Sequence, residues 1–234
     1  MKKGLYLISL LIICLILAFA LKTISNSLTF QFYGNIHNRV STSDKVIALT
    51  FDDEPNAMTD QILAVLEARN VKATFFVIGS QLEKDLPAGK KILAGGHELG
   101  NHSYSHTDLT FKSLDYIRHE IEKTDSLIRQ TGFKGDILFR PPFGKKLISL
   151  PWYLKQHNRK TITWDVAAPA SGKSPAQVVN HLIESSKPGS IILFHSLDGN
   201  TSPQIISKVI ADLQKKGYEF KTVSELMEYE GGKE

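Results

Sequence analysis

The chain has 234 residues, and 42% of them are hydrophobic, which is enough to bury one substantial core, so we expect one globular domain. Its formal net charge is +4, but three of the lysines flank an N-terminal hydrophobic segment, and the remainder carries 25 basic against 24 acidic residues. This near-neutral balance excludes the basic footprint of a nucleic-acid-binding protein. The single cysteine, Cys14, excludes an intramolecular disulfide.

The first 22 residues predict export. Two lysines at positions 2 and 3 precede an unbroken apolar run from Gly4 to Leu21, long enough for a signal peptide or a membrane span. The positive-inside rule places the lysines in the cytoplasm and the rest of the chain outside it. We therefore expect an extracytoplasmic protein, secreted after cleavage behind Ala20 or anchored in the cell membrane through residues 4–21. The length of the run favours an uncleaved anchor.

Residues 23–44 are polar and show no sustained period, so we expect a linker there, a domain over residues 45–228 and a polar tail over 229–234. The domain begins with a nearly continuous apolar run that is typical of a strand covered on both faces in a parallel sheet.

That first strand ends on two adjacent carboxylates, Asp52 and Asp53. Neighbouring side chains on a regular strand point to opposite faces, so both can serve one site only where the strand breaks. The following Glu54-Pro55 dipeptide supplies a break, because proline restricts the residue before it and cannot donate to a ladder. A turn or helix cap is the alternative interpretation of such a pair.

Downstream, strand-like runs alternate with amphipathic stretches. Further strands are expected at 73–78, 97–101, 137–139, 161–166, 190–195 and 220–223, which makes seven in all. Helices are expected at 59–69, 81–94 with an interruption near Pro87, 112–130, 146–157, 175–185 and 204–216. This alternation predicts an α/β fold with a parallel sheet, open or closed. Its polar clusters follow the strands, where such folds place their sites.

A metal site is one use for the histidines of HSYSH at 102–106. His102 and His106 are separated by three residues and can share one metal ion with a carboxylate such as that of Asp53. Three protein ligands leave a position open for water, which is the catalytic arrangement, although a histidine pair alone is commonly structural. Two imidazoles and one carboxylate favour zinc, with cobalt or nickel as substitutes.

Two further residues lie at predicted strand ends. Arg140 opens the stiff sequence RPPFG at 140–144, where it either orients a carboxylate or forms a solvated turn. His195 closes an apolar strand, where it either packs as a core histidine or protonates a leaving group.

Taken together, these blocks carry a family resemblance. In order along the chain they are TFDDEP at 50–55, VKATFFVIG at 71–79, GHELGNHS at 96–103, HSYSH at 102–106, RPPFG at 140–144 and LFHS at 193–196. The chain from about 45 to 228 resembles the polysaccharide deacetylase family (NodB-homology domain, carbohydrate esterase family 4). The resemblance implies a distorted (β/α)7-8 barrel, here preceded by an N-terminal hydrophobic helix. It also implies a metal-dependent hydrolase that removes N-acetyl, or sometimes O-acetyl, groups from polysaccharides.

The resemblance also implies a role for each matching residue. Asp52 resembles the general base, Arg140 the residue that holds it, and His195 the general acid. The metal ligands correspond to Asp53, His102 and His106, and the backbone N–H of Phe143 corresponds to the oxyanion donor.

The chain departs from the family pattern in two places. Glu54 stands where glycine is usual and brings a third carboxylate near the expected metal. The block at 164–171 lacks both aspartates and the second tryptophan of W-x-V-D-x-x-D-W, and one of those aspartates orients the histidine acid in the family. Our hypothesis is that Asp165 substitutes, because it lies two residues before position 167 on the same strand face.

We therefore expect an exported deacetylase of an N-acetylglucosamine-containing polysaccharide, such as peptidoglycan or an exopolysaccharide. One alternative is a catalytically impaired glycan- or metal-binding protein of the same fold, which the altered block motivates. Another is a related barrel amidohydrolase that acts on small amides. Acetate release from a glycan discriminates among the three.

Overall fold

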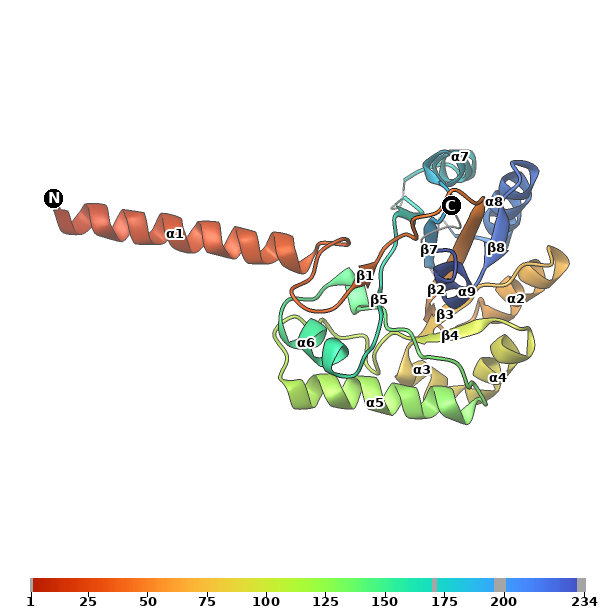
Figure 1. Cartoon of the computed structure of the whole chain (residues 1–234), viewed down its shortest axis with the longest axis horizontal. Helices are drawn as coiled ribbons and strands as arrows, with labels where there is room; N and C mark the ends of the chain where they lie inside the picture. Colours follow the sequence, from red (N-terminus) through yellow and green to blue (C-terminus); the bar gives the residue numbers. More distant parts are fainter. Residues whose placement is uncertain (1, 170–171, 196–200, 231–234) are drawn as a thin grey trace.

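The computed structural model describes residues 2–169, 172–195 and 201–230. It contains a long N-terminal helix, α1 (Lys2–Ser25), that projects from an α/β domain as a straight rod (Figure 1). Positions 170–171 of the altered block, Ser196 of LFHS and residues 231–234 of the expected tail lie outside the described residues.

The centre of the domain is β2 (Val46–Glu54), which is buried at eight of its nine positions because its side chains are apolar on both faces. It pairs in parallel with β3 (Thr74–Val77), β7 (Ile191–His195) and β8 (Glu219–Lys221). The sheet runs in the order β4-β3-β2-β7-β6, and β8 joins β2 beside this path. The outer strands are β4 (Glu98–Asn101) and β6 (Val166–Ala167).

A second pair of strands extends the curve of the sheet. β1 (Ile36–His37) pairs in parallel with β5 (Thr161–Ile162), and Phe139 bridges both Asn101 of β4 and Thr161 of β5. The strands thus follow a barrel that pairing between the described residues leaves incompletely closed. The predicted fold class, a distorted (β/α) barrel of parallel strands preceded by an apolar helix, is confirmed.

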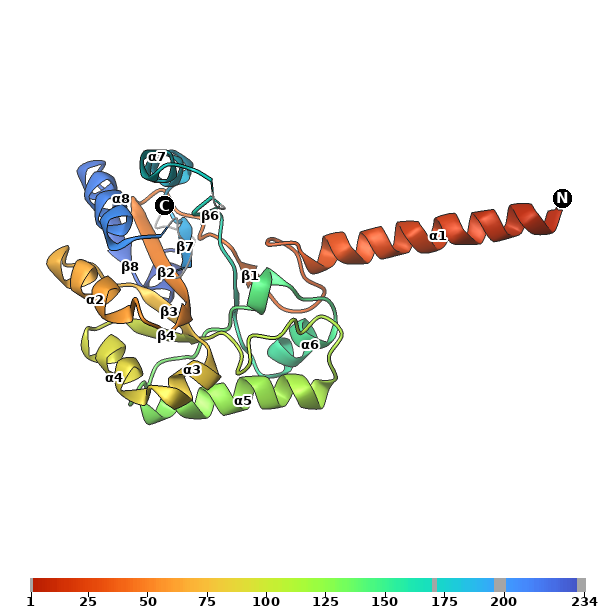
Figure 2. The same cartoon turned by 180° about the vertical axis from the view of Figure 1, so that it is seen from behind.

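Helices cover the outside of the sheet (Figures 1 and 2). They are α2 (Thr59–Ala68), α3 (Gly79–Lys84), α4 (Leu86–Ala94), α5 (Leu114–Gln130), α6 (Ser149–Gln156), α7 (Pro175–Ser185), α8 (Pro203–Lys215) and α9 (Val223–Met227). Between helices and sheet the rings of Phe75 and Phe194 stack on either side of Phe51, at 5.1 and 5.6 Å between centroids. Each fully buried phenylalanine contributes about 1.5–3 kcal/mol.

The strand expected at 161–166 is two short strands, β5 and β6. The N–H of Thr163 makes the last bond of the β1–β5 pairing, to the carbonyl of His37, and the strand ends there because the carbonyl of Thr163 accepts from Arg140 instead. Residues 137–139 form no regular strand; Phe139 makes isolated bridges only. The described chain therefore has eight strands where seven were expected.

The segment 23–44, for which we expected a linker, packs against the domain. Val40 is completely buried and donates to the carbonyl of Gly189. Thr163 Oγ1 donates to the carbonyl of Leu28 at 2.6 Å, and Ser25 at the end of α1 is also buried. Its apolar residues are irregularly spaced, so the segment has no hydrophobic period that would predict this packing.

Candidate active site

Asp52 and Asp53 lie at the carboxyl end of β2, and a local irregularity brings them to one site. The register of β2 against β3 shifts between Asp52 and Glu54. Asp53, the residue in between, has a φ of 65°, in the left-handed region that side chains rarely adopt. The irregularity thus lies at Asp53, one residue before the Glu54-Pro55 dipeptide to which we assigned the break, and β2 continues to Glu54.

Asp53, His102 and His106 form a compact cluster of metal-ligating side chains, with one donor atom from each within 4.8 Å of the others. Oδ1 of Asp53 lies 3.8 Å from Nε2 of His102 and 3.3 Å from Nε2 of His106. The same Oδ1 is buried and makes no hydrogen bond among the described residues. An orphaned carboxylate oxygen facing two imidazole nitrogens fits a divalent metal ion, because buried polar atoms are otherwise paired.

A backbone contact also sets which ring nitrogen of His102 is available to bind a metal. Nδ1 lies 2.8 Å from the carbonyl oxygen of Arg140, which leaves Nε2 as the nitrogen that faces the cluster. Burial lowers the pKa of His102, and the neighbouring Asp52 opposes this shift. A neutral imidazole with a bare Nε2 is the metal-binding form.

Buried hydrogen bonds shape the loop that carries both histidines. Ser103 and His106 have left-handed backbones, with φ of 64° and 56°. The N–H of Ser103 donates to Oδ1 of Asn101 at 2.8 Å, and the N–H of His106 donates to Oγ of Ser103 at 3.0 Å. Glu120 of α5 accepts from the N–H groups of Tyr104 and Ser105, at 3.0 and 2.8 Å.

Sequence reasoning missed Glu120. It is 3% exposed and lies on the buried stripe of α5, whose other members are Ile117, Ile121, Thr124, Leu127 and Ile128. The sequence does carry a signal for it: a glutamate among the apolar and small residues of one helix face is expected to be buried, and a buried carboxylate needs hydrogen-bond partners.

The carboxylate of Asp52 is paired with Arg140 inside the domain. Oδ1 lies 2.6 Å from Nη1, and the two residues are 1% and 0% exposed. The guanidinium also donates to Oγ1 of Thr50 at 2.8 Å and to the carbonyl of Thr163 at 3.0 Å, and it stacks 4.0 Å from the ring of Phe76. Burial lowers the pKa of Arg140, and Asp52 opposes the shift. Arg140 is therefore not the solvated turn residue of the alternative interpretation.

Phe143 and His195 lie at the same edge of the sheet. Phe143 has a φ of 58° within a short 3-10 turn, Pro142–Gly144, and its half-exposed ring lies 4.6 Å from the ring of His106. His195 ends β7 in direct register with Asp52 on the neighbouring strand. The structure thus gathers seven of the eight predicted site residues around the ends of β2, β4 and β7.

The eighth, Asp165, lies elsewhere. Its carboxylate accepts from Oγ of Ser190 at 2.8 Å and from the N–H of Ile191 at 2.9 Å. Ile191 begins β7 and His195 ends it, about 13 Å further along the strand at 3.3 Å per residue. This placement does not support the hypothesis that Asp165 orients His195.

Glu54, which we expected to bring a third carboxylate near the metal, has its contacts in the turn before α2 instead. Its Oε2 accepts from Oγ1 of Thr59 and, at 3.2 Å, from the N–H of Asn56. This oxygen holds the turn that leads into α2, because Glu54 has moved past the break at Asp53.

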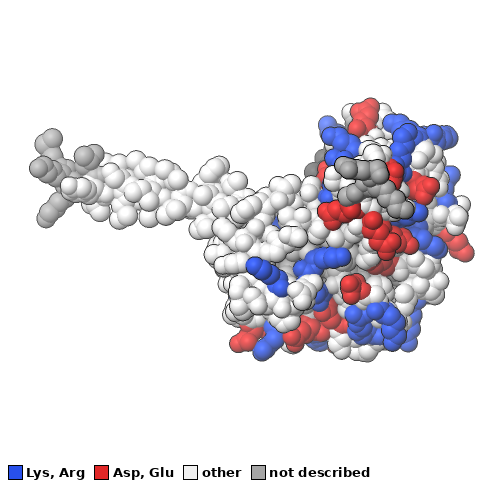
Figure 3. All heavy atoms as spheres, in the orientation of Figure 1, with Lys and Arg blue, Asp and Glu red and all other residues white. Residues whose placement is uncertain are grey.

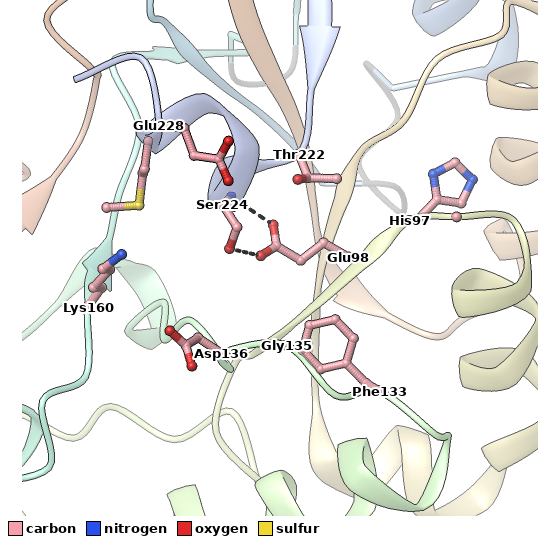
Figure 4. Close-up of a pocket in the computed structure, with 11 residues that line it drawn as sticks. His97, Glu98, Phe133, Gly135, Asp136, Lys160, Thr222, Ser224 and Glu228 are labelled. Atoms are coloured by element: carbon pink, nitrogen blue, oxygen red, sulfur yellow. Dashed lines mark hydrogen bonds between the residues drawn. The ribbon is translucent and has the colours of Figure 1, made fainter. Parts of the chain in front are cut away.

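A cavity of about 420 Å³ lies at the opposite ends of the strands and contains none of the predicted site residues (Figure 4). It is lined by residues that precede β4 and β5 or belong to the α9 region, including His97, Asp136, Lys160 and Glu228. Glu98 points toward α9 and accepts from Oγ and N–H of Ser224. In α/β barrels this face serves stability, whereas the carboxyl ends of the strands carry the site.

Comparison with known proteins gives a consistent result. A family model described as polysaccharide deacetylase matches residues 39–162. A peptidoglycan-N-acetylglucosamine deacetylase of Bacillus cereus is 32% identical over 203 residues, which cover 84% of this chain and 94% of that protein. A bifunctional xylanase/deacetylase of Pseudobutyrivibrio xylanivorans is 37% identical over 85% of this chain, which spans only 33% of that longer protein. The crystal structure of a peptidoglycan N-acetylglucosamine deacetylase superposes with a TM-score of 0.75 at 31% identity, covering 83% of this chain and 94% of the other.

Proposed function

Because the chain belongs to the polysaccharide deacetylase family, and is a hydrolase of that family, we propose that it removes N-acetyl groups from an extracytoplasmic glycan that contains N-acetylglucosamine. Peptidoglycan is the first candidate, since two of the similar proteins carry that substrate in their names. An exopolysaccharide is the second. The observation that carries the proposal is the Asp53, His102 and His106 cluster beside the buried Asp52–Arg140 pair.

We propose that the cluster holds a divalent metal ion. Its two imidazoles and one carboxylate favour zinc, with cobalt or nickel as substitutes. When bound there, the ion supplies Lewis-acid polarisation of the acetyl carbonyl and of the attacking water.

The proton transfers fall to protein side chains. Asp52 takes a proton from the attacking water, and Arg140 holds the Asp52 carboxylate in position, because the guanidinium lies 2.6 Å away in a buried setting. Attack by water on the acetyl carbon forms acetate as the carbon–nitrogen bond breaks. His195 gives a proton to the departing amine, and the backbone N–H of Phe143 stabilises the negative charge on the acetyl oxygen.

We further propose that α1 anchors the protein in the cell membrane. The stretch Tyr6–Ser25 is 20 residues long with a mean hydropathy of 2.7, which is long and apolar enough to span a bilayer. The end of this helix is built into the domain: the N–H of Lys146 donates to the carbonyl of Ser25 at 3.0 Å.

Acetate release tests the proposed activity. The full chain in detergent is stripped of metal, reloaded with zinc, and incubated with acetylated chito-oligomers and with peptidoglycan. We expect release only after reloading, and none from Asp53→Asn. Zinc binding without release from any glycan would favour the binding-protein alternative, and release from small non-sugar amides alone would favour the amidohydrolase.

A further inference from the structure

The exposed hydrophobic side chains of the domain are not scattered. Outside α1, the large hydrophobic residues that are exposed among those described fall in three segments, 30–33, 111–114 and 143–152. They are Phe30, Phe32, Tyr33, Phe111, Leu114, Phe143, Ile148 and Trp152. Phe111 is 83% exposed. Single exposed apolar residues are ordinary, but a gathered set marks an interaction surface.

All three segments meet the end of α1. Oγ of Ser25 lies 3.2 Å from Oγ1 of Thr110, next to Phe111. The carbonyl of Ser25 accepts from the N–H of Lys146, and the segment 30–33 begins five residues after the end of α1. A groove of about 390 Å³ separates the last turns of α1 from Phe111 and Lys145. Figure 3 shows that the part of the domain nearest α1 is mostly free of charged side chains in this view, while blue and red atoms gather farther away.

The length of α1 fixes how near this surface comes to a bilayer, given the anchor proposed above. The apolar run ends at Leu21, and Ser25 is already bonded to the domain. Four helical residues span about 6 Å. The headgroup region on one side of a bilayer is about 5–8 Å thick. No free linker intervenes, so the domain surface around Ser25 reaches the headgroup layer.

We propose that segments 30–33, 111–114 and 143–152 form a membrane-facing surface that rests in the headgroup layer of the bilayer spanned by α1. Aromatic side chains favour that layer, where an apolar body and a wet surrounding coexist. The bilayer that covers the exposed apolar face of α1 continues onto these residues. Binding of a separate protein would not explain why the exposed apolar segments lie next to the helix that spans the bilayer.

The membrane-facing surface borders the candidate active site. Phe143 belongs to both, since its ring is 56% exposed and lies 4.6 Å from the ring of the metal-site residue His106. The site therefore opens beside the membrane surface, and it takes glycan presented there rather than glycan far out in the wall.

Site-specific fluorescence tests the surface in the full chain, reconstituted in phospholipid vesicles. Three proteins carry the environment-sensitive dye NBD on a single cysteine: wild type at Cys14, Cys14→Ser with Phe111→Cys, and Cys14→Ser with Lys215→Cys as the matched control. Lys215 is an exposed residue of α8, away from α1 (Figures 1 and 2). We expect blue-shifted emission at 14 and 111, with several-fold stronger quenching by spin-labelled lipid than at 215.

The three dyes separate the possible failures. Quenching at 14 with emission at 111 equal to that at 215 would overturn the membrane-facing surface while leaving the anchor intact. Absence of quenching at 14 would overturn the anchor and, with it, this inference, but not the hydrolytic activity. An emission change at 111 on adding soluble chito-oligomers, without lipid quenching, would show a glycan-binding surface instead.

Discussion

Four residues of the candidate site have left-handed backbone conformations: Asp53, Ser103, His106 and Phe143. None is glycine, and each such conformation costs on the order of 1–3 kcal/mol unless surrounding contacts hold it. Backbone N–H groups of the histidine loop donate to Oδ1 of Asn101 and to the carboxylate of Glu120, and these hydrogen bonds hold the loop. Sequence motifs predicted the side chains that meet, but these backbone angles depend on tertiary contacts and have no local signal.

Replacing Glu120 by alanine tests whether that loop positions the metal ligands. The variant leaves the N–H groups of Tyr104 and Ser105 without their acceptor, and the weaker outer contacts loosen His102 and His106, so we expect zinc affinity to fall by about 10- to 100-fold. Competition with a chromophoric chelator measures it. Glu122→Ala on the same helix is the control, because the Glu122 carboxylate accepts from Tyr153 outside the loop. Equal zinc affinities for the two variants would contradict the positioning role.

At the scale of elements, the long amphipathic helices and β2 were predictable because hydrophobic periodicity sets them. The two-residue strands were not, since β1 and β5 are too short to show a period. β5 and β6 are separated at Thr163, whose carbonyl bonds to Arg140. The hydrogen bond from Arg140, which is distant in sequence, thus separates the two strands, and no local pattern predicts it.

A buried carboxyl ties α9 to the sheet and makes its attachment depend on pH. Glu98 accepts from Oγ1 of Thr74 and from the side chain and N–H of Ser224, and burial raises its pKa above 4.5. Because the folded state binds the Glu98 proton more tightly than the unfolded chain does, protonated Glu98 stabilises the fold. This contribution to the free energy of unfolding is complete below pH 4.5 and is lost as the pH rises through the folded-state pKa.

Glu98→Gln removes that dependence. The glutamine oxygen can accept from Thr74 and from the N–H of Ser224, while its amide donates to the Ser224 hydroxyl. We expect the variant to have a higher free energy of unfolding than wild type at pH 7, with the difference shrinking toward pH 4.5. Urea denaturation across that range measures it. A difference that grows on acidification would contradict the assignment.

At the scale of the whole molecule, the segment 26–44 completes the domain. Loss of Val40 alone forfeits about 1.5–3 kcal/mol of burial, and the contacts of β1 and Leu28 are lost with it. We expect a chain that begins at residue 45 to unfold at markedly lower urea concentration than one that begins at residue 23. Equal midpoints would mean that the segment is a dispensable linker, as its composition first suggested.

The overall class of fold, and the proximity of seven of the eight predicted site residues, were predictable, because strand-end motifs in parallel folds converge on one edge. The eighth was not, since strand spacing gives the face of a side chain but not its partner. Asp165 shares a face with position 167, yet it bonds to Ser190 and Ile191 at the amino end of β7. Glu54 is near Asp53 in sequence, but the break between them turns it toward α2.

The central claim is that Asp52 acts in glycan deacetylation, and a pair of conservative variants tests it most directly. Acetate release from zinc-loaded protein is measured for Asp52→Asn and Asp165→Asn, with zinc binding and urea stability recorded for both. We predict that Asp52→Asn binds zinc but loses at least about 100-fold in activity, as expected for a general base. Asp165→Asn is predicted to keep near wild-type activity, because its carboxylate lies at the far end of β7. Full activity in Asp52→Asn, or loss in a stable Asp165→Asn, would contradict this account.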